Sequence, residues 1–236
     1  MEQIKNKVIL ITGGSKGIGY GIAEALVHQH AKVAITSRTQ ASADKAAAQL
    51  NKIGKGEAIG IAADVRTSDS QQQAVSVILR KWGKLDVLVA NAGLGYFGSI
   101  ESLSEEQWRE TIDTNLTGVF HSVKASVAAL KDSKGYIITI ASLAGANFFA
   151  GGSAYNASKF GLVGFTQAIM LDLRSQGIKV TTIMPGSVAT EFGGESSEGN
   201  WKIQPEDLGQ MVVDLLRMHP RTLPSKIEVR PSIPSK

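Results

Sequence analysis

The stretch Val8-Ile9-Leu10-Ile11-Thr12-Gly13-Gly14-Ser15-Lys16-Gly17-Ile18-Gly19 decides the fold of this chain. Its apolar, largely β-branched start predicts a short buried strand over residues 7–12 that stops at glycine. A helical pattern follows through Leu26. A strand, a glycine-rich turn and a helix N-terminus form an anion site, because backbone N–H groups and the helix dipole both favour negative charge there. The stretch therefore predicts a bound phosphate group.

The spacing of these glycines, Gly13-x-x-x-Gly17-x-Gly19, is not the usual Gly-x-Gly-x-x-Gly fingerprint of dinucleotide sites. The glycines still permit a tight turn and let a pyrophosphate approach the backbone closely. A tight turn that binds nothing is the alternative interpretation. The position of the turn, directly after the first strand, favours phosphate binding.

Strands and helices alternate along the rest of the chain. The apolar patterns predict strands at 32–37, 57–62, 85–90, 135–141, 179–184 and 226–229. They predict helices at 39–52, 68–82, 111–130, 155–174 and 205–218. This alternation is typical of right-handed βαβ units and a parallel sheet. Ligands of such sheets bind beyond the C-terminal ends of the strands, where Asp64, Asn91 and Gly93 fall.

Three helices carry further local signals. Ser68 or Asp69 is a plausible N-cap for the helix at 68–82. A separate helix begins at Ser104, where Gln107 occupies the reciprocal position of a capping box. Asn115 interrupts the apolar pattern of the long helix at 111–130 although it has poor helix propensity. The pattern alone does not separate a special role for Asn115 from an ordinary polar position.

The composition describes an ordinary globular chain. It has 236 residues, of which 43% are hydrophobic and 19% charged, and this favours one domain with its own core. No cysteine is present, which excludes disulfides, thiolate catalysis and cysteine-bound metal clusters and is compatible with a reducing cytosol. The net charge of +4 comes without a basic block, so we expect no nucleic-acid partner. The four histidines lack metal-ligand spacing, and we expect no metal site.

Neither apolar stretch of note predicts a targeting or membrane segment. The run at residues 8–11 is too short for the core of a signal peptide. The stretch 136–154 contains glycines and polar residues, which predict a strand followed by a loop rather than a spanning helix. We therefore expect no membrane partner and a cytoplasmic location.

The end of the second predicted strand indicates the type of dinucleotide. An acidic residue there would hydrogen-bond the ribose 2′-hydroxyl of NAD, but the sequence is Ser37-Arg38-Thr39. An arginine at this position suits a 2′-phosphate, and Lys16 in the glycine turn could reach the same group. Solvated basic side chains are the alternative for both residues. Two cations and a missing carboxylate favour NADP(H).

The pentapeptide Tyr155-Asn156-Ala157-Ser158-Lys159 carries the predicted chemistry. Residues four apart lie on one face of a helix, so the phenol and the ammonium can point into one pocket. A nearby ammonium is expected to lower the pKa of the tyrosine, which could then give a proton to a carbonyl oxygen or take one from an alcohol. A chance pair on an amphipathic helix is the alternative.

Together these motifs resemble the short-chain dehydrogenase/reductase family across essentially the whole chain. The matching residues are Thr12-Gly13-x-x-x-Gly17-x-Gly19, Asp64, Asn91-Ala92-Gly93, Asn115, Ser142, Tyr155-x-x-x-Lys159 and Pro185-Gly186-x-x-x-Thr190. The resemblance implies a doubly wound Rossmann fold, with a parallel sheet of about seven strands and helices on both faces. It implies a single domain over residues 1–236, in which the Gly- and Ser-rich segment at about 187–204 is a short substrate lid.

The resemblance also implies roles for individual residues. Tyr155 is expected to be the general acid/base, and Lys159 to lower its pKa and hold the nicotinamide ribose. Ser142 is expected to hydrogen-bond the substrate carbonyl oxygen, and Asn115 to kink its helix and hold a water near Lys159. Asp64 and Val65 are expected at the adenine, Asn91 at the adenosine ribose and Thr190 at the carboxamide. The expected cofactor contacts are Gly13, Ser15, Lys16, Gly17, Ile18, Gly19, Ser37, Arg38, Thr39, Asp64, Val65, Asn91, Ala92, Gly93, Tyr155, Lys159, Pro185, Gly186, Val188 and Thr190.

The substrate is the least determined feature of the sequence. Leu94, Phe148 and Phe149 are expected to meet it beside Ser142 and Tyr155, and core packing is the alternative for each apolar residue. Further apolar candidates for the pocket are Tyr96, Phe97, Phe192 and Trp201. The short lid favours a small or medium ketone or aldehyde.

The predicted activity is therefore the reversible, NADPH-dependent reduction of a ketone or aldehyde to an alcohol. A 3-oxoacyl-[acyl-carrier-protein] reductase is the first alternative, and Gln176, where such enzymes usually carry arginine, weakens it. A catalytically idle NADP-binding protein is the second, although all four residues of the family's catalytic set are present. The family resemblance also leads us to expect a homo-oligomer, either a tetramer or a dimer.

Overall fold

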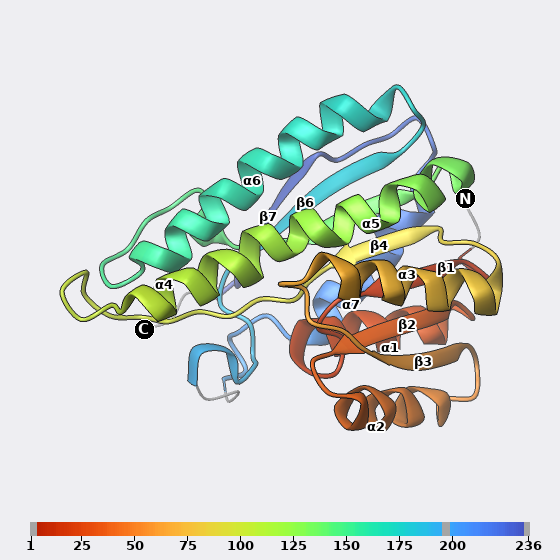
Figure 1. Cartoon of the computed structure of the whole chain (residues 1–236), viewed down its shortest axis with the longest axis horizontal. Helices are drawn as coiled ribbons and strands as arrows, with labels where there is room; N and C mark the ends of the chain where they lie inside the picture. Colours follow the sequence, from red (N-terminus) through yellow and green to blue (C-terminus); the bar gives the residue numbers. More distant parts are fainter. Residues whose placement is uncertain (1–3, 195–198, 234–236) are drawn as a thin grey trace.

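Seven parallel strands form one sheet at the centre of the molecule (Figure 1). The computed structural model describes residues 4–194 and 199–233. Its strands are β1 (Val8–Ile11), β2 (Lys32–Ser37), β3 (Glu57–Ala62), β4 (Val87–Ala90), β5 (Tyr136–Ile140), β6 (Lys179–Pro185) and β7 (Lys226–Val229). Its α-helices are α1 (Gly17–His28), α2 (Gln40–Asn51), α3 (Ser68–Trp82), α4 (Glu105–Ile112), α5 (Gly118–Ser133), α6 (Ser153–Arg174) and α7 (Pro205–Arg217). The predicted Rossmann-type architecture is confirmed.

The strand order places a ligand site at the middle of the sheet. The order is β3-β2-β1-β4-β5-β6-β7, so β1 pairs with β2 on one side and with β4 on the other. The chain leaves β1 toward one half of the sheet and leaves β4 toward the other. In open parallel sheets, such a reversal opens a crevice at the C-terminal strand ends. The turns after β1 and β4 therefore border the crevice.

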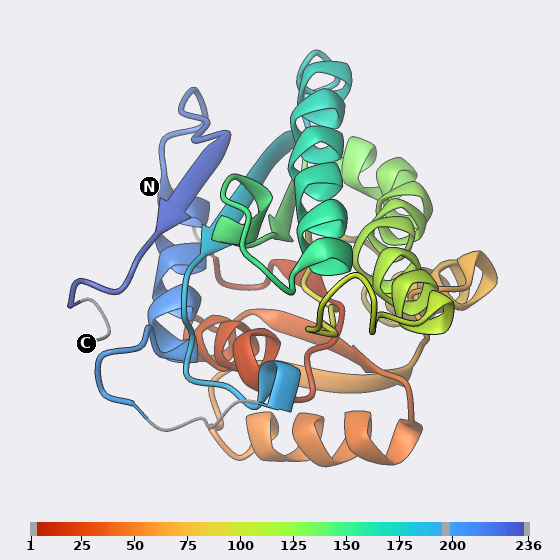
Figure 2. The same ribbon diagram turned by 90° about the vertical axis from the view of Figure 1, so that its left-hand side faces the viewer.

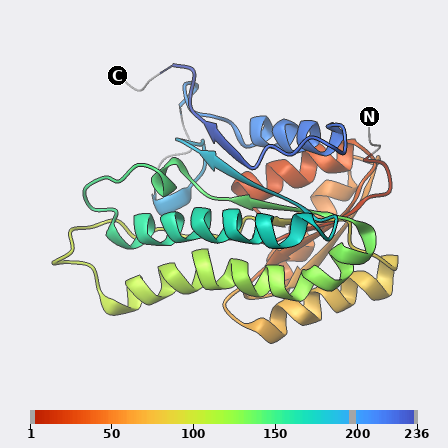
Figure 3. The same ribbon diagram turned by 90° about the horizontal axis from the view of Figure 1, so that it is seen from above.

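Helices cover both faces of the sheet, which explains why all four residues of β1 are buried (Figure 3). Ile9 and Ile11 face a core built with α1, α2 and α7. Val8 and Leu10 face the opposite core, built with α3, α5 and α6. Side chains alternate between the two faces of a strand, so a strand covered on both sides must be apolar throughout.

The predicted start of the long helix at residue 111 is wrong. Residue 111 still belongs to α4, and α4 meets α5 through a π-helical turn. The turn, η1, spans Asp113–Thr117, and the N–H of Gly118 bonds to the carbonyl of Asp113. This hydrogen bond spans five residues instead of the four of an α-helix, so the turn around Asn115 holds one extra residue. The helix irregularity expected at Asn115 is therefore confirmed. The capping box of Ser104 and Gln107 at the start of α4 is also confirmed.

Two smaller expectations have separate outcomes. The N-cap of α3 is Thr67, not Ser68 or Asp69, because Ser68 already belongs to the helix. The apolar stretch 136–154 is confirmed as a strand, β5, with a short 3₁₀ turn, η2 (Leu143–Gly145), and a loop before α6. Among the helices that the structure describes, none combines the length and apolar character needed to cross a bilayer.

Glycine at position 60 lets α2 lie close to β3. A Cβ atom on Gly60 would approach the carbonyl carbon of Ala43 to 2.4 Å, whereas a Cβ on Gly164 of α6 would meet nothing within 4 Å. We expect Gly60→Ala to lower the free energy of unfolding by about 1–3 kcal/mol through overpacking. Gly164→Ala is the control, and it should raise this free energy by up to about 1 kcal/mol through helix propensity. Urea unfolding measures both, and equal midpoints for the two variants would contradict the close packing.

Candidate active site

The glycine turn after β1 has the geometry of an anion site. Gly13 and Gly17 adopt φ values of 64° and 57°, which favour glycine because it lacks a Cβ. A Cβ on Gly13 would lie 2.9 Å from the Cα of Ala92, so the turns after β1 and β4 are in close contact. No side chain caps α1 at Lys16. The first-turn N–H groups of α1 are therefore free of a side-chain cap, and this donor set fits a pyrophosphate.

Hydrogen bonds from Thr12 and Asn91 join these two turns. The Thr12 hydroxyl accepts from the backbone N–H groups of Asn91 at 3.0 Å and Ala92 at 3.1 Å. The Asn91 side-chain amide donates to the carbonyls of Thr12 and Gly13 at 3.0 and 3.1 Å. Asn91 thus shapes the floor of the crevice through these bonds. Thr12, a buried hydroxyl at the end of an apolar strand, is the sequence signal for this arrangement.

A cleft of about 1590 Å³ runs along the C-terminal strand ends and brings most of the predicted site together. Of the predicted residues, Gly13, Ser15, Lys16, Gly17, Ile18, Ser37, Arg38, Asp64, Val65, Asn91, Ala92, Gly93, Leu94, Ser142, Phe148, Phe149, Tyr155, Lys159, Pro185, Gly186, Val188 and Thr190 line it. Gly13 to Ile18 and Lys159 lie in this one cleft, which exceeds the size typical of a single small ligand. Its donors and dimensions fit a dinucleotide together with a substrate.

Three predicted residues do not line the cleft. Gly19 is buried against Asn91, whose Nδ2 atom would lie 2.5 Å from an added Cβ, so Gly19 is required for packing. Thr39 caps α2, where its side chain accepts from the N–H of Ser42. Gly19 and Thr39 thus have structural roles, and the direct cofactor contacts expected for them stay predictions. Asn115 has no exposed surface and reaches the cleft only through its neighbours.

Asn115 connects the turn after β4 to the helix that carries Tyr155. Its amide donates to the carbonyl of Leu94 at 2.8 Å and to the hydroxyl of Ser158 at 3.0 Å. Its Oδ1 atom accepts from the N–H of Leu94 at 2.8 Å. Ser158 in turn donates to the carbonyl of Tyr155 at 2.7 Å. The π-helical turn thus presents an amide that fixes two sides of the site.

Tyr155 and Lys159 lie at the same end of the cleft. The Nζ atom of Lys159 lies 5.6 Å from the Tyr155 ring centroid and donates to the carbonyl of Ile140 at 3.1 Å. Ser142 and Tyr155 both line the cleft, and the Ser142 hydroxyl is near enough to the phenol to lower its pKa. Ser142 also accepts from the N–H of Ala144 at 3.1 Å, which orients its side chain. The phenol, the serine hydroxyl and the ammonium therefore converge, as the four-residue spacing predicts.

The expected lowering of the Tyr155 pKa is wrong, because the pKa of this phenol is raised. Burial raises the pKa of Tyr155, and the hydrogen bond from Ser142 only partly opposes this. Burial also lowers the pKa of Lys159 to about 8. Both groups lose hydration, and desolvation disfavours whichever form is charged. The phenol is therefore protonated at neutral pH, which suits a proton donor.

Aromatic rings enclose Tyr155 on its cleft side. The Tyr155 ring centroid lies 5.5 Å from that of Phe97 and 5.6 Å from that of Phe192. Phe97 also lies 6.0 Å from Phe149. Phe148, which was expected at the substrate, lines the cleft but is 87% exposed. Phe149 instead joins the rings around Tyr155 through its contact with Phe97. Phe97 and Phe192 were only candidates from sequence because nothing in the pattern separates them from core residues.

The other end of the cleft holds the residues expected at the 2′-phosphate. Ser15 donates to Ser37 across the two strand ends at 3.3 Å, and Arg38 follows Ser37 at the cleft wall. Lys16 forms an exposed ion pair with Glu191 at 3.8 Å. Glu191 precedes the short 3₁₀ helix η3 (Phe192–Gly194), which lies in front of the strand ends in Figure 2. Residues 195–198 of the predicted lid lie outside the described residues.

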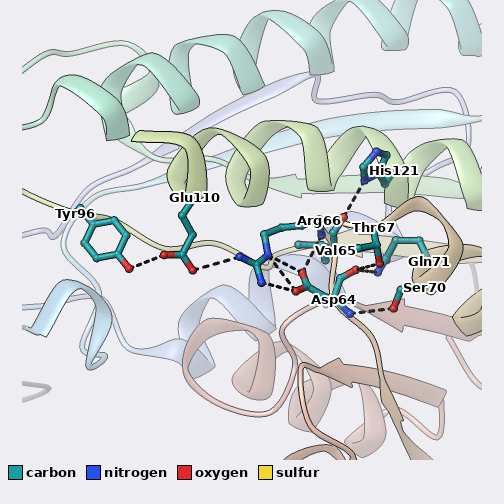
Figure 4. Close-up of polar contacts among 9 residues, drawn as sticks. All are labelled: Asp64, Val65, Arg66, Thr67, Ser70, Gln71, Tyr96, Glu110 and His121. Atoms are coloured by element: carbon teal, nitrogen blue, oxygen red, sulfur yellow. Dashed lines mark hydrogen bonds and ion pairs between the residues drawn. The ribbon is translucent and has the colours of Figure 1, made fainter. Parts of the chain in front are cut away.

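A polar chain that sequence analysis missed runs from Asp64 to the loop after β4 (Figure 4). The Arg66 guanidinium donates to both oxygens of Asp64, at 2.7–3.1 Å, and lies 3.5 Å from Glu110. Glu110 accepts from the Tyr96 hydroxyl at 2.6 Å. Hydrogen bonds from Arg66 lower the pKa of Asp64, and the hydrogen bond to Glu110 raises the pKa of Tyr96. No motif predicted this chain of contacts, because Glu110 is distant in sequence from both Arg66 and Tyr96.

The fold and this cleft define a dinucleotide-binding oxidoreductase. The model of the short chain dehydrogenase family matches residues 7–201, and the chain belongs to that family. It is 38% identical over 194 residues to trans-4-hydroxycyclohexanecarboxylate dehydrogenase from Sinomonas cyclohexanicum, which covers 80% of this chain and 75% of that protein.

Two solved structures are similar over nearly the whole chain. Alcohol dehydrogenase from the archaeon Thermococcus sibiricus, complexed with 5-hydroxy-NADP, has a TM-score of 0.92 and 29% identity, over 98% of this chain and 100% of that one. The 3-ketoacyl-(acyl-carrier-protein) reductase from Brucella melitensis, complexed with NADH, has a TM-score of 0.89 and 25% identity, over 97% of this chain and 98% of that one. Relatives of this fold thus bind either nicotinamide dinucleotide.

The buried ammonium predicts a pH-dependent stability. A shift of the Lys159 pKa from 10.5 to about 8 corresponds to a cost of about 3 kcal/mol, because each pKa unit is worth about 1.4 kcal/mol. Between pH 8 and 10.5 the unfolded chain binds more protons than the folded one at this group, so stability rises with pH. Below pH 8 both states are protonated and the full cost remains.

We therefore expect Lys159→Met to unfold at higher denaturant concentration than the wild type at pH 7, with an advantage that shrinks between pH 8 and 10.5. Urea titrations of both proteins without cofactor, at several pH values, measure this difference. The comparison with the wild type cancels the contributions of the other titrating groups. A difference that stays constant with pH would show that Lys159 is not buried as an ammonium.

Proposed function

We propose that this protein is an NADPH-dependent carbonyl reductase that reduces a small or medium ketone or aldehyde to an alcohol, reversibly. The observation that carries the proposal is the placement of Tyr155, Ser142 and Lys159 together in one dinucleotide-sized cleft, with the Lys159 Nζ atom 5.6 Å from the Tyr155 ring centroid. We further propose that the chain works as one domain, with residues 187–204 as a lid over the cleft.

The chain supplies proton transfer and positioning in this proposal. Ser142 donates a hydrogen bond to the carbonyl oxygen, and Tyr155 gives that oxygen its phenolic proton. A bound nicotinamide dinucleotide supplies the reducing equivalents for the carbonyl carbon. Lys159 lies beside Tyr155 and favours the phenolate that remains after proton transfer, because opposite charges attract strongly in a buried site.

The proposal of NADP(H) rests on the second strand end. Ser37 and Arg38 stand at the cleft wall, where an acidic residue would select NAD. Lys16 is a weaker contributor, because its ion pair with Glu191 directs it toward the lid. The similar structures hold an NADP derivative in one case and NADH in the other, so Arg38 is the residue that supports the choice.

A 3-oxoacyl-[acyl-carrier-protein] reductase is the second candidate, because the similar structure from Brucella melitensis is a 3-ketoacyl-(acyl-carrier-protein) reductase. Against it, Gln176 is an uncharged side chain whose amide donates to the carbonyl of Asp172. An acidic carrier protein would find no cation at this position. A panel of ketones, aldehydes and 3-oxoacyl thioesters, scored by NADPH consumption, distinguishes the two candidates.

We also propose a homo-oligomer and a cytoplasmic location. Support for association comes from the exposed aromatic residues Phe120 on α5 and Phe160 on α6. Large apolar side chains at the surface are common at sites of protein contact. Sedimentation of the purified protein measures the oligomeric state, and cell fractionation measures the location.

Tyr155→Phe should remove the proton donor and leave the cleft almost unchanged. We expect turnover to fall by about 10²–10⁴-fold, the typical contribution of general acid catalysis, with little change in NADPH affinity. Tyr136→Phe is a matched control, because Tyr136 is another buried tyrosine and bonds to Thr181 away from the cleft. Retained turnover in Tyr155→Phe would mean that another group supplies the proton.

Arg38→Ala should weaken NADPH binding far more than NADH binding. A hydrogen bond to a charged group contributes about 1.5–3 kcal/mol, so we expect roughly a 10- to 100-fold loss of NADPH affinity. Fluorescence titration of each dinucleotide measures the two affinities. Arg80→Ala, on the exposed surface of α3, is the control. Equal losses for both dinucleotides would contradict the role of Arg38.

A further inference from the structure

Four rings from separate segments meet at the substrate end of the cleft. Phe97 comes from the loop after β4, Phe149 from the loop before α6, and Phe192 from η3. They surround the ring of Tyr155 with centroid distances of 5.5–6.5 Å among the contacting pairs. All four side chains line the same cleft. We call Phe97, Phe149 and Phe192 the phenylalanine cluster.

Glycines allow the phenylalanine cluster to form. A Cβ on Gly95 would lie 2.9 Å from the Phe97 ring and 3.1 Å from the Phe192 ring. A Cβ on Gly193 would lie 2.6 Å from the Phe97 ring. Cβ atoms almost never approach other atoms this closely, so these glycines give the rings room to meet. The cluster is therefore a packed arrangement that the surrounding backbone accommodates.

The rings nevertheless keep much of their surface open. Phe97 is 45% exposed and Phe149 is 47% exposed, whereas Tyr155, which contacts Phe97, is only 9% exposed. The contacts of Phe97 with Tyr155 and Phe192 are edge-to-face, at 71° and 65°. Such contacts join the positive edge of one ring to the negative face of another, and each ring can accept further partners of the same kind.

On the basis of the proposed function, we infer that the substrate is a ketone that carries an aryl ring on a short linker. Ser142 and Tyr155 bind the carbonyl oxygen, and the aryl ring occupies the open side of the phenylalanine cluster. An aliphatic chain would bury similar apolar area there. It would lack the edge-to-face contacts, which are specific to aromatic partners and add binding free energy beyond that from buried apolar area.

Two ketones of matched size test this inference. The carbonyl groups of 4-phenylbutan-2-one and 4-cyclohexylbutan-2-one are separated from the ring by the same two carbons, so their reactivity is alike. We expect the phenyl compound to have a kcat/KM roughly 2- to 12-fold higher with NADPH, as aromatic contact energies imply. Equal or reversed values would overturn the inference and leave the proposed reductase activity intact.

Substitutions then locate the preference. Phe97→Leu and Phe192→Leu keep an apolar side chain but remove a ring, so the ratio of the phenyl to the cyclohexyl kcat/KM should fall toward one in each variant, whatever the change in absolute turnover. Phe120→Leu is the matched control, because Phe120 is similarly exposed but lies on α5 outside the cleft. A preference that survives in both cleft variants would overturn the role of the cluster.

Failure of the proposed function gives a different result. If the protein reduces neither ketone with NADPH, the proposed carbonyl reductase activity is contradicted. The aromatic preference is then tested by comparing the binding affinities of the two corresponding alcohols. Calorimetry with 4-phenylbutan-2-ol and 4-cyclohexylbutan-2-ol in the presence of NADP measures this preference. Tighter binding of the phenyl alcohol would support the inference, and equal affinities would overturn it.

Discussion

The site depends on how the turn after β4 is held on its two sides. Toward β1, the Thr12 hydroxyl and the Asn91 amide tie this turn to the glycine turn. Toward α6, Asn115 binds both backbone groups of Leu94 and the hydroxyl of Ser158. Each of these polar groups is buried or partly buried, so leaving one unpaired would cost about 1–3 kcal/mol. The distance between the glycine turn and Tyr155 is therefore set by hydrogen bonds with little freedom to change.

The buried groups at the end of the cleft lower the stability of the folded chain. Tyr155 and Lys159 are both largely removed from water, and Lys159 is held by the carbonyl of Ile140 rather than by a carboxylate. A buried ammonium without an opposite charge destabilises the folded chain. Active sites commonly keep such groups because a proton donor surrounded by fixed dipoles needs no rearrangement of water during reaction.

Local patterns predicted the strands, the glycine turn and the Tyr155–Lys159 pair, because each depends on residues that are close in sequence. Family resemblance added Ser142 and Asn115. The resemblance implied a kink at Asn115 but not its π-helical form, and the contact of Asn115 with Leu94, 21 residues away, could not be predicted from local sequence. The Arg66–Glu110 contact was missed for the same reason. The three residues of the phenylalanine cluster were named as pocket candidates, but their mutual contacts could not be predicted. The pKa of Tyr155 was predicted in the wrong direction because burial, which a sequence does not reveal, raises it more than Ser142 lowers it.

The π-helical turn at Asp113–Thr117 has a consequence for how this chain tolerates length changes. An α-helix turns about 100° for each residue, because it has 3.6 residues per turn. Removing one residue from the turn would let α4 and α5 join as a regular helix, but α4 would swing around its axis by about that angle. Glu110 would then face away from Arg66 and Tyr96. The extra residue therefore sets the rotation of α4 relative to α5, so that Glu110 on α4 faces Arg66 and Tyr96.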